Sequence, residues 1–502
     1  MRFALPIRFA QGFCLSSILV CGCATSRPAT TGVPAALPTN PEPESVDPMP
    51  PVHVRAVSQT THLQVLIEDD EWVAESVADG LPQASSAGEL PAPPAERLSG
   101  TTLEEFESIA LANNPTIQQL IATTQKAAGY RLQVGLKANP IVGYNGTQLA
   151  DEGTAQHTGF FSREVVTGGK LQANQRVLNE ALRAQLFELE AQRQRVLTDV
   201  RVTYFEALAS QRRIELTREF EDVVRRGYEL ATVRKNAMEA SQIEVLQSKI
   251  QLNQVELTLQ QSQVRYNAAW RTLSALAGEP DRPVGELRGR FDLETASLDW
   301  PTIAVSLINE SPEYLAAQTR VQQAVANLQR QGIQAIPNLQ VQAASGYDYG
   351  TNSGLINVEV AAPIPLFNKN QGNIAAARAD YVRASLDVTR VKNSIQARLA
   401  VVSNDYEQAA AAVSKYKLEI MPSAEQTLKL AEQAYRAGEF SFLEVLIVRR
   451  TYFDSTLLNL ESQLALAQAA ARVDGFVLTG GLDATVDLSG DDSLRGQTFS
   501  QQ

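Results

Sequence analysis

The side chains best suited to covalent or metal chemistry are few, and most lie near the start of the sequence. The three cysteines are Cys14, Cys21 and Cys23, so the chain beyond residue 23 can form neither a disulfide nor a thiolate metal site. The three histidines are scattered between residues 53 and 157 without metal-ligand spacing. The sequence also has no Gly-rich phosphate loop and no nucleophile–base pair. We therefore expect no enzyme activity, no metal site and no cofactor.

The cysteine at residue 23 lies in a sequence context that is typical of acylation. Residues 1–22 have the features of a secretory signal peptide, because basic residues precede an apolar run, 13–20, that is too short to span a bilayer. The run ends in Leu19-Val20-Cys21-Gly22-Cys23, which resembles a bacterial lipobox and implies that Cys23 is acylated, for example with palmitate. Ala24 in place of Asp resembles lipoproteins sorted to the outer membrane. The alternative is an ordinary signal peptide that happens to contain cysteines.

The charged and proline residues of the sequence indicate which kinds of partner and which segments to expect. The 502 residues carry a formal net charge of −12, which argues against nucleic acid, since phosphate binding needs clustered Lys and Arg. Twelve of the 23 prolines lie between residues 24 and 99. Proline removes backbone donors and blocks helices, so we expect residues 23–99 to form an extended tether.

The body of the chain repeats itself. Pro115 and Pro312 are 197 residues apart, Tyr204 and Tyr406 are 202 apart, and a Glu-Val-Leu triplet recurs with an offset of 200. The near-constant offset predicts two tandem copies of one unit, residues 101–290 and 300–482, followed by a polar C-terminal tail, 483–502.

Each copy has the pattern of a helix of about thirty residues, a short non-helical region and two long helices that meet at a tip. Thr101 and Glu104 have the spacing of a capping box at the first helix. Gly438 marks the reversal in the second copy. The helix after it has the spacing of a coiled-coil seam, carried by Phe453, Leu457, Leu460, Leu464, Ala467 and Ala471.

The non-helical regions predict β-hairpins, at about 138–166 and 337–364. In the second, Leu339, Val341, Ile356 and Val358 alternate with polar residues such as Gln340 and Glu359. The strands have the length of membrane strands, with the apolar residues facing lipid. Four strands cannot close a barrel, so several chains must combine theirs. The alternative is two surface hairpins on a soluble helical rod.

Taken together, these features resemble the outer-membrane efflux protein family (TolC-like channels). The motifs that carry the resemblance are residues 110–115 (Ala-Leu-Ala-Asn-Asn-Pro), 166–170 (Val-Thr-Gly-Gly-Lys), 365–367 (Pro-Leu-Phe) with Gly372, 435–438 (Tyr-Arg-Ala-Gly) and 442–446 (Phe-Leu-Glu-Val-Leu). The resemblance implies a mainly α protein that forms a homotrimer, with a 12-stranded outer-membrane barrel and an α-helical periplasmic tunnel. It also implies an exit duct that docks a periplasmic adaptor (membrane fusion protein) linked to an inner-membrane transporter.

The same resemblance places the functional residues at the tips. Glu444 matches an acidic residue that narrows the closed end of related channels, and three copies imply a carboxylate ring that favours cations. Ile447 occupies the position of a second acidic residue in some relatives. Gly438 matches the turn glycine, Tyr435 either braces the closed state or only packs, and Glu244 is the first-copy partner of Glu444. The alternative for Glu444 is a solvated carboxylate on a helix face.

Two functions remain open on these patterns. The first is the export duct, and the second is a structural lipoprotein whose coiled coils span the periplasm without conducting anything. The apolar stripe on the strands favours the duct, since a rod has no need of it. The cargo is undetermined among metal ions, organic compounds and polypeptides, and the four methionines form no cluster suited to soft metals.

Overall fold

The structure, a computed structural model, describes residues 100–150, 153–291, 297–491 and 493–494. The chain divides into two units, 1–93 and 94–502, and all described residues belong to the second. The expected signal peptide 1–22, the acylation site Cys23 and the tether 23–99 therefore lie outside the described residues.

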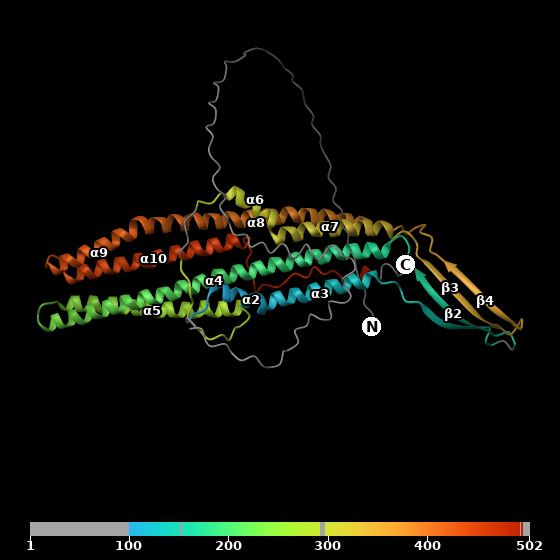
Figure 1. Cartoon of the computed structure of the whole chain (residues 1–502), viewed down its shortest axis with the longest axis horizontal. Helices are drawn as coiled ribbons and strands as arrows, with labels where there is room; N and C mark the ends of the chain where they lie inside the picture. The colour runs from blue at the N-terminus through green and yellow to red at the C-terminus, as the bar shows by residue number, and fades with distance from the viewer. Residues whose placement is uncertain (1–99, 151–152, 292–296, 492, 495–502) are drawn as a thin grey trace, which may run out of the picture. The chain divides into compact units, whose positions relative to one another are not determined.

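The two copies have the same order of elements (Figure 1). The first copy comprises α2 (Leu103–Asn113), α3 (Pro115–Gly135), β1 (Ile141–Thr147), β2 (Gln156–Val165), α4 (Lys170–Asn236) and α5 (Gln242–Leu276). The second comprises α6 (Trp300–Glu310), α7 (Pro312–Ile333), β3 (Leu339–Asp348), β4 (Ser353–Ala361), α8 (Gln371–Lys415), η1 (Tyr416–Ile420), α9 (Met421–Arg436) and α10 (Phe442–Asp474). The predicted tandem repeat of long helices and two-stranded hairpins is confirmed.

The start of each copy differs from the prediction. We expected one helix of about thirty residues, but each copy has two, divided before Pro115 and Pro312. The residue before a proline is disfavoured in the α region, so the helix ends there and restarts with proline in its first turn. The first capping box also lies one residue later than predicted, since Thr102 accepts from the Glu105 backbone N–H.

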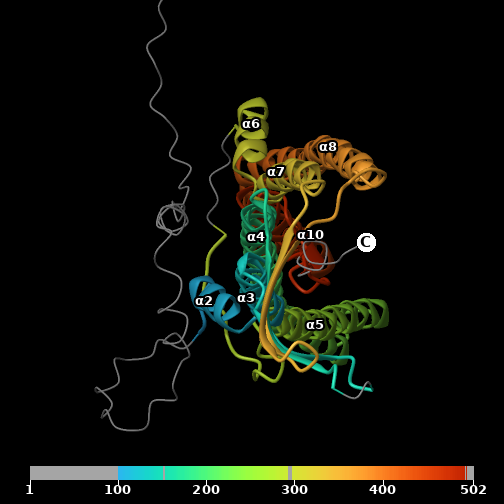
Figure 2. The same cartoon turned by 90° about the vertical axis from the view of Figure 1, so that its right-hand side faces the viewer.

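Helix α4 is the central element. Its 67 residues extend about 100 Å at 1.5 Å per residue. Figure 2, viewed from the strand end, shows α7 and α8 on one side of α4 and α3 and α5 on the other. The predicted seam of α10 is buried, and the Phe453 ring stacks on Phe220 of α4 with centroids 4.2 Å apart. The coiled-coil prediction is therefore confirmed.

The outgoing helix of the second copy contains a proline, Pro422. Residues 416–420 form a π-helical turn, η1, and Pro422 follows in the first turn of α9. Proline has no N–H to donate within a helix and its ring clashes with the preceding turn. The wider π turn accommodates it, so the path from α8 to α9 continues without a chain reversal.

The four strands form one antiparallel sheet of order β1-β2-β3-β4. The two copies meet in the middle of it, where Phe161 is the partner of Ala343 and Val165 is the partner of Leu339. Strands β1 and β4 are its edges. The sheet is therefore built jointly by the two repeats, which the sequence pattern did not indicate.

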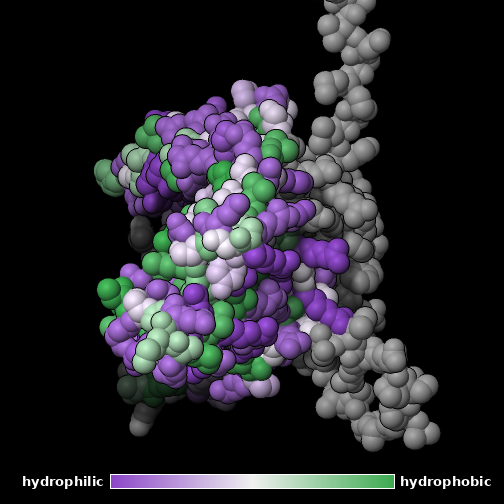
Figure 3. Space-filling model, turned by 90° about the vertical axis from the view of Figure 1, so that its left-hand side faces the viewer, coloured by the Kyte–Doolittle hydropathy of each residue, from purple (hydrophilic) through white to green (hydrophobic). Residues whose placement is uncertain are grey.

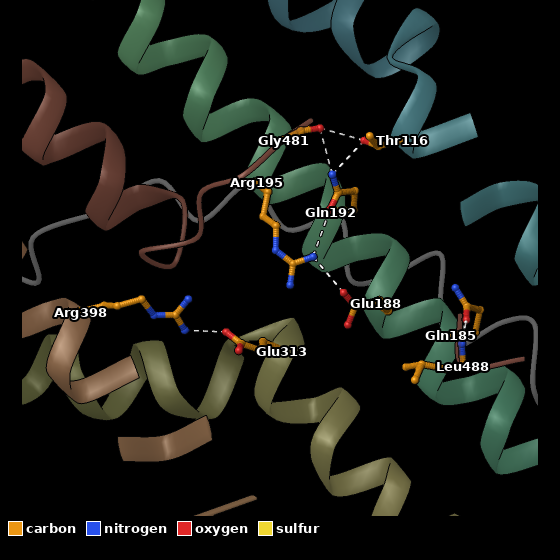
Figure 4. A network of polar contacts seen from close by, with 9 residues as sticks. All are labelled: Thr116, Gln185, Glu188, Gln192, Arg195, Glu313, Arg398, Gly481 and Leu488. Atoms are coloured by element: carbon orange, nitrogen blue, oxygen red, sulfur yellow. Dashed lines mark hydrogen bonds and ion pairs between the residues drawn. The ribbon is translucent and has the colours of Figure 1, made fainter. Parts of the chain in front are cut away.

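The chain after α10 runs back along α3 and α4, and we call residues 476–491 and 493–494 the C-terminal strap. Gln192 of α4 donates to the Gly481 carbonyl at 3.0 Å and to Thr116 Oγ1 at 2.8 Å, and the Leu488 N–H donates to Gln185 at 2.7 Å (Figure 4). The side chain of Asp199 accepts from the N–H groups of Gly480 and Gly481 at 2.9 and 2.7 Å. Part of the expected polar tail thus belongs to the packed body.

Among the helices in the described part of the chain, none combines the length and apolar character needed to cross a membrane.

We predict that Asp199→Ala destabilises the protein by about 1–3 kcal/mol, because two N–H groups of the C-terminal strap lose their acceptor. Burial raises the pKa of Asp199, although both donors oppose that shift. Thermal unfolding followed by circular dichroism measures the loss. Asp222→Ala, at an exposed position of the same helix, is the control and should change stability by less than about 0.5 kcal/mol. Equal effects of the two substitutions would contradict the anchoring role of Asp199.

Candidate functional site at the hairpin tips and the sheet

The two hairpin tips share one backbone design. At the second tip, Gly438 has φ +79°, its N–H donates to the Tyr435 carbonyl, and the next N–H donates back to Ala434. The predicted turn glycine is confirmed as the left-handed residue. At the first tip, Met238 holds the same place, with φ +63° and the same pair of hydrogen bonds to Lys235 and Arg234.

Met238 is the residue that sequence reasoning missed at the first tip. The offset of 200 that relates Glu244 to Glu444 also relates Met238 to Gly438. A side chain with positive φ is strained by contact with its own backbone. The Met238 side chain is 95% exposed, so no packing contact offsets that strain.

Glu444 and Glu244 both complete capping boxes. The Glu444 carboxylate accepts from the Ser441 N–H at 2.7 Å, and the Glu444 N–H donates to Ser441 Oγ at 3.3 Å. Ser241 and Glu244 repeat the arrangement. The donated N–H lowers the pKa of Glu444, so its charge persists to lower pH than usual. Each tip thus holds a carboxylate at the start of its returning helix.

Two aromatic rings connect the second tip to the rest of the body. Tyr435 meets Phe442 edge to face with centroids 6.2 Å apart. Phe442 in turn lies against Gly227 of α4, where a Cβ would approach its ring to 2.8 Å. Tyr435 thus packs against the returning helix of its own tip. The absence of a side chain at Gly227 allows α10 to approach α4 closely.

Two ion pairs lie near the second tip. Arg449 binds Glu432 at 2.8 Å, and Arg450 binds Asp454 at 2.8 Å. Neither ion pair involves Glu444. Ile447, one turn after Glu444, is 54% exposed. Glu444 and Ile447 are thus open to solvent in the single chain.

Exposed apolar side chains gather at this end of the helices. Figure 3 looks onto the tips, where hydrophobic residues (green) lie between hydrophilic ones (purple). The exposed apolar residues of the first tip are Val233, Met238, Ile243 and Leu246, and those of the second are Phe440 and Ile447. Clustered exposed apolar groups are typical of surfaces that bind another protein.

The sheet has one apolar and one polar face, as the alternation predicted. The register places Val341, Ala343, Val358 and Val360 on one side, where they continue across the neighbouring strands as Phe161 and Val142. Ile356 and Val358 are 81% and 66% exposed. The opposite side carries Gln340, Gln342, Asn357 and Glu359 from β3 and β4, with Ser162 and Glu164 from β2.

An aromatic cluster stands at the turn end of the apolar face. His157 stacks on Tyr144 and meets Tyr349 edge to face, with centroids 5.9 and 5.7 Å apart, and Tyr349 meets Tyr347 at 5.1 Å. The Tyr144 hydroxyl also bonds to His157 Nδ1. An apolar band bordered by aromatic residues is typical of membrane strands. The histidine that seemed isolated in the sequence is a member of this border.

A family model described as outer membrane efflux protein matches residues 108–279 and 304–476, one match for each copy. The chain belongs to the outer membrane efflux protein family. Both matches span the long helices and the strands described above, so the family assignment rests on the whole body of the chain.

This outer membrane efflux protein is similar to known proteins both in sequence and in fold. It is 25% identical over 389 residues to the cobalt-zinc-cadmium resistance protein CzcC of Cupriavidus metallidurans, which covers 77% of this chain and 92% of the relative. Its fold is similar to that of the MtrE outer membrane channel of Neisseria gonorrhoeae, with a TM-score of 0.62, 16% identity and coverage of 75% and 89%. The outer-membrane channel OprN matches with a TM-score of 0.60, 14% identity and coverage of 80% and 98%.

Within the residues that the structure describes, no group of three or more His, Cys, Asp or Glu side chains is arranged to hold an ion.

We predict that Met238→Gly stabilises the first tip by about 1 kcal/mol, because glycine adopts positive φ without strain. The matched change Gly438→Met should destabilise the second tip by a similar amount, since it introduces the same strain. Hydrogen exchange of the amides on either side of each turn measures both effects in the intact protein. A slower exchange after Gly438→Met, or a faster one after Met238→Gly, would contradict this account.

Proposed function

We propose that this outer membrane efflux protein is the passive exit duct of a tripartite export system. The observation that carries the proposal is the sheet, whose apolar face is exposed and bordered by aromatic rings while its other face is polar. In lipid the apolar face meets acyl chains and the polar face lines a water-filled passage. A structural rod leaves this exposed face unexplained. Passage through the proposed duct involves no catalytic step.

The edges of the sheet support a homotrimer. Strands β1 and β4 have no neighbour on their outer sides within the described chain, and an unpaired strand edge is not tolerated in lipid. Three copies joined β4 to β1 would give a closed barrel of twelve strands. The helices continue from the same strands, so they would surround a tunnel whose far end is made of the hairpin tips.

The tips are the proposed docking and gating region. Their exposed apolar residues offer a surface for a periplasmic adaptor that leads to an inner-membrane transporter. Glu444, Ile447, Tyr435, Gly438 and Glu244 are the proposed tip residues. Lipid would contact Leu339, Val341, Ile356 and Val358, and Cys23 would add an acyl anchor to the outer membrane.

We predict that the purified trimer conducts ions in planar bilayers and that Glu444→Gln lowers its preference for cations. The substitution removes three charges from the trimer, while the amide oxygen of Gln still accepts from the Ser441 N–H, so the tip keeps its fold. Reversal potentials in asymmetric salt measure the selectivity.

The control for that experiment is Glu219→Gln, which removes the same charge from an exposed position of α4. It should leave the reversal potential unchanged. A bilayer without current would contradict the duct itself. Unchanged selectivity with Glu444→Gln would remove only Glu444 from the proposed site.

For the cargo we propose divalent metal cations. The support is the similarity to CzcC, a cobalt-zinc-cadmium resistance protein of which this chain covers 92%. We predict that a host strain without this chain becomes more sensitive to Co²⁺, Zn²⁺ and Cd²⁺ and that the intact gene restores resistance. Growth in graded metal concentrations measures the effect, with an organic toxicant as the control. Sensitivity to the organic compound alone would contradict this cargo.

A further inference from the structure

The segment between β4 and α8 exposes three large apolar side chains that neither the sheet nor the helices cover. Ile364, Leu366 and Phe367 are 78%, 69% and 91% exposed. They follow Ala361, the last residue of β4, at the end where the strand joins the helices (Figure 1). An exposed group of this kind indicates a surface that is covered in the working protein.

This segment is held in place at both ends. Ala361 is paired with Gln340 in the sheet. At the other end the Asn370 side chain donates to the carbonyl of Gln331 at 2.8 Å and to its side-chain oxygen at 2.7 Å. Gln331 is itself buried on α7. The apolar side chains therefore project from a fixed loop.

The backbone of this segment suits a medium with little water. Pro363 and Pro365 have no N–H, and the Leu366 N–H donates to the Ile364 carbonyl at 2.9 Å. Three of the four residues 363–366 thus present no unsatisfied donor. An unpaired N–H is costly where acyl chains replace water, so proline at these positions lowers the free energy of contact with lipid.

The side chains also continue the apolar stripe of β4. Ile356, Val358 and Val360 lie on one face, and Ile364 has the same parity in the chain that continues from β4. The turn made by the Leu366 N–H and the Ile364 carbonyl ends this alternation before Leu366. Two exposed basic side chains lie near the junction of the strands and the helices. They are Arg163, which is paired with Val341 in the sheet, and Lys369, two residues after Phe367. Aromatic and basic side chains together are typical of the membrane–water interface.

A second copy of the chain is the other conceivable cover, and the register argues against it. Strand β1 begins at Ile141, which lies level with Glu359 through Ser162 and Gln342. A copy that joins β4 by its β1 edge at this same level places no strand residue opposite residues 363–367.

We propose that Ile364, Leu366 and Phe367 form a lipid-contacting anchor, inserted at the bilayer interface on the side where the strands meet the helices. The anchor sets the depth of the protein in the membrane. This inference rests on the proposed function, because it takes the strands to cross the membrane.

The test places tryptophan at Phe367 in the full-length trimer, reconstituted in vesicles of phosphatidylcholine that carry bromine at different depths of the acyl chain. Bromine quenches tryptophan by contact, and emission of the parent protein with its three tryptophans is subtracted. Phe367→Trp should be quenched, most strongly by bromines near the head group. Val358→Trp, in the middle of β4, should be quenched most strongly by bromines deeper in the chain. Asn357→Trp, on the polar face, should be quenched by neither.

The outcomes separate the anchor from the duct. Quenching of Val358→Trp without Phe367→Trp would overturn the anchor and assign this segment to a protein contact. Quenching of neither variant would overturn both the anchor and the membrane strands. Should Phe367→Trp fail to assemble, Phe367→Cys with a nitroxide label gives the same answer, since oxygen must relax the label more than a water-soluble nickel complex does if the anchor is correct.

Discussion

The hydrogen-bonding groups along the outer edges of β1 and β4 are the constraint on which the rest of this structure depends. A sheet of four strands with an apolar face is unfavourable in water because the apolar face is exposed. It is also unfavourable in lipid because the hydrogen-bonding groups of its two edge strands are unpaired. In the proposed trimer, closure by further copies would satisfy the edges and the face together. The duplication of the chain suits this arrangement, because each repeat alone supplies two strands and the β2–β3 pairing joins the two pairs in one sheet.

The long helices follow from the same requirement. Strands that are fixed in one sheet also fix where α4 and α8 begin, so both helices extend from the same sheet. Packing along α4, through contacts such as Phe220 with Phe453, keeps the two hairpins parallel over most of their length. The C-terminal strap adds polar contacts along α3 and α4, among them Gln192 with Gly481. Strands and tips are therefore coupled through one continuous, rigid body.

At the tips, one chemical group serves two purposes. The carboxylates of Glu244 and Glu444 satisfy a helix terminus and also place charge at the end of the proposed passage. The two tips differ mainly in what surrounds this arrangement. The first has a strained, exposed Met238 and further apolar residues, whereas the second uses an unstrained Gly438 and packs Phe442 against α4. This difference gives a partner two distinct surfaces in each chain.

The sequence by itself determined the repeat, the coiled-coil seam of α10, the turn at Gly438 and the two faces of β3 and β4. These features depend on local periodicity and on residues with restricted backbone geometry, which a single chain displays directly. Tertiary structure decided the pairing of β2 with β3, the course of the strap and the role of Met238. The cap at Thr102 in place of Thr101 likewise depended on which hydroxyl the folded chain brought to the helix. The strand pairing and the strap result from contacts between residues far apart in sequence, which no local pattern encodes. The roles of Thr102 and Met238 result from local backbone geometry, because neighbouring residues offer similar patterns and only the folded backbone selects one of them.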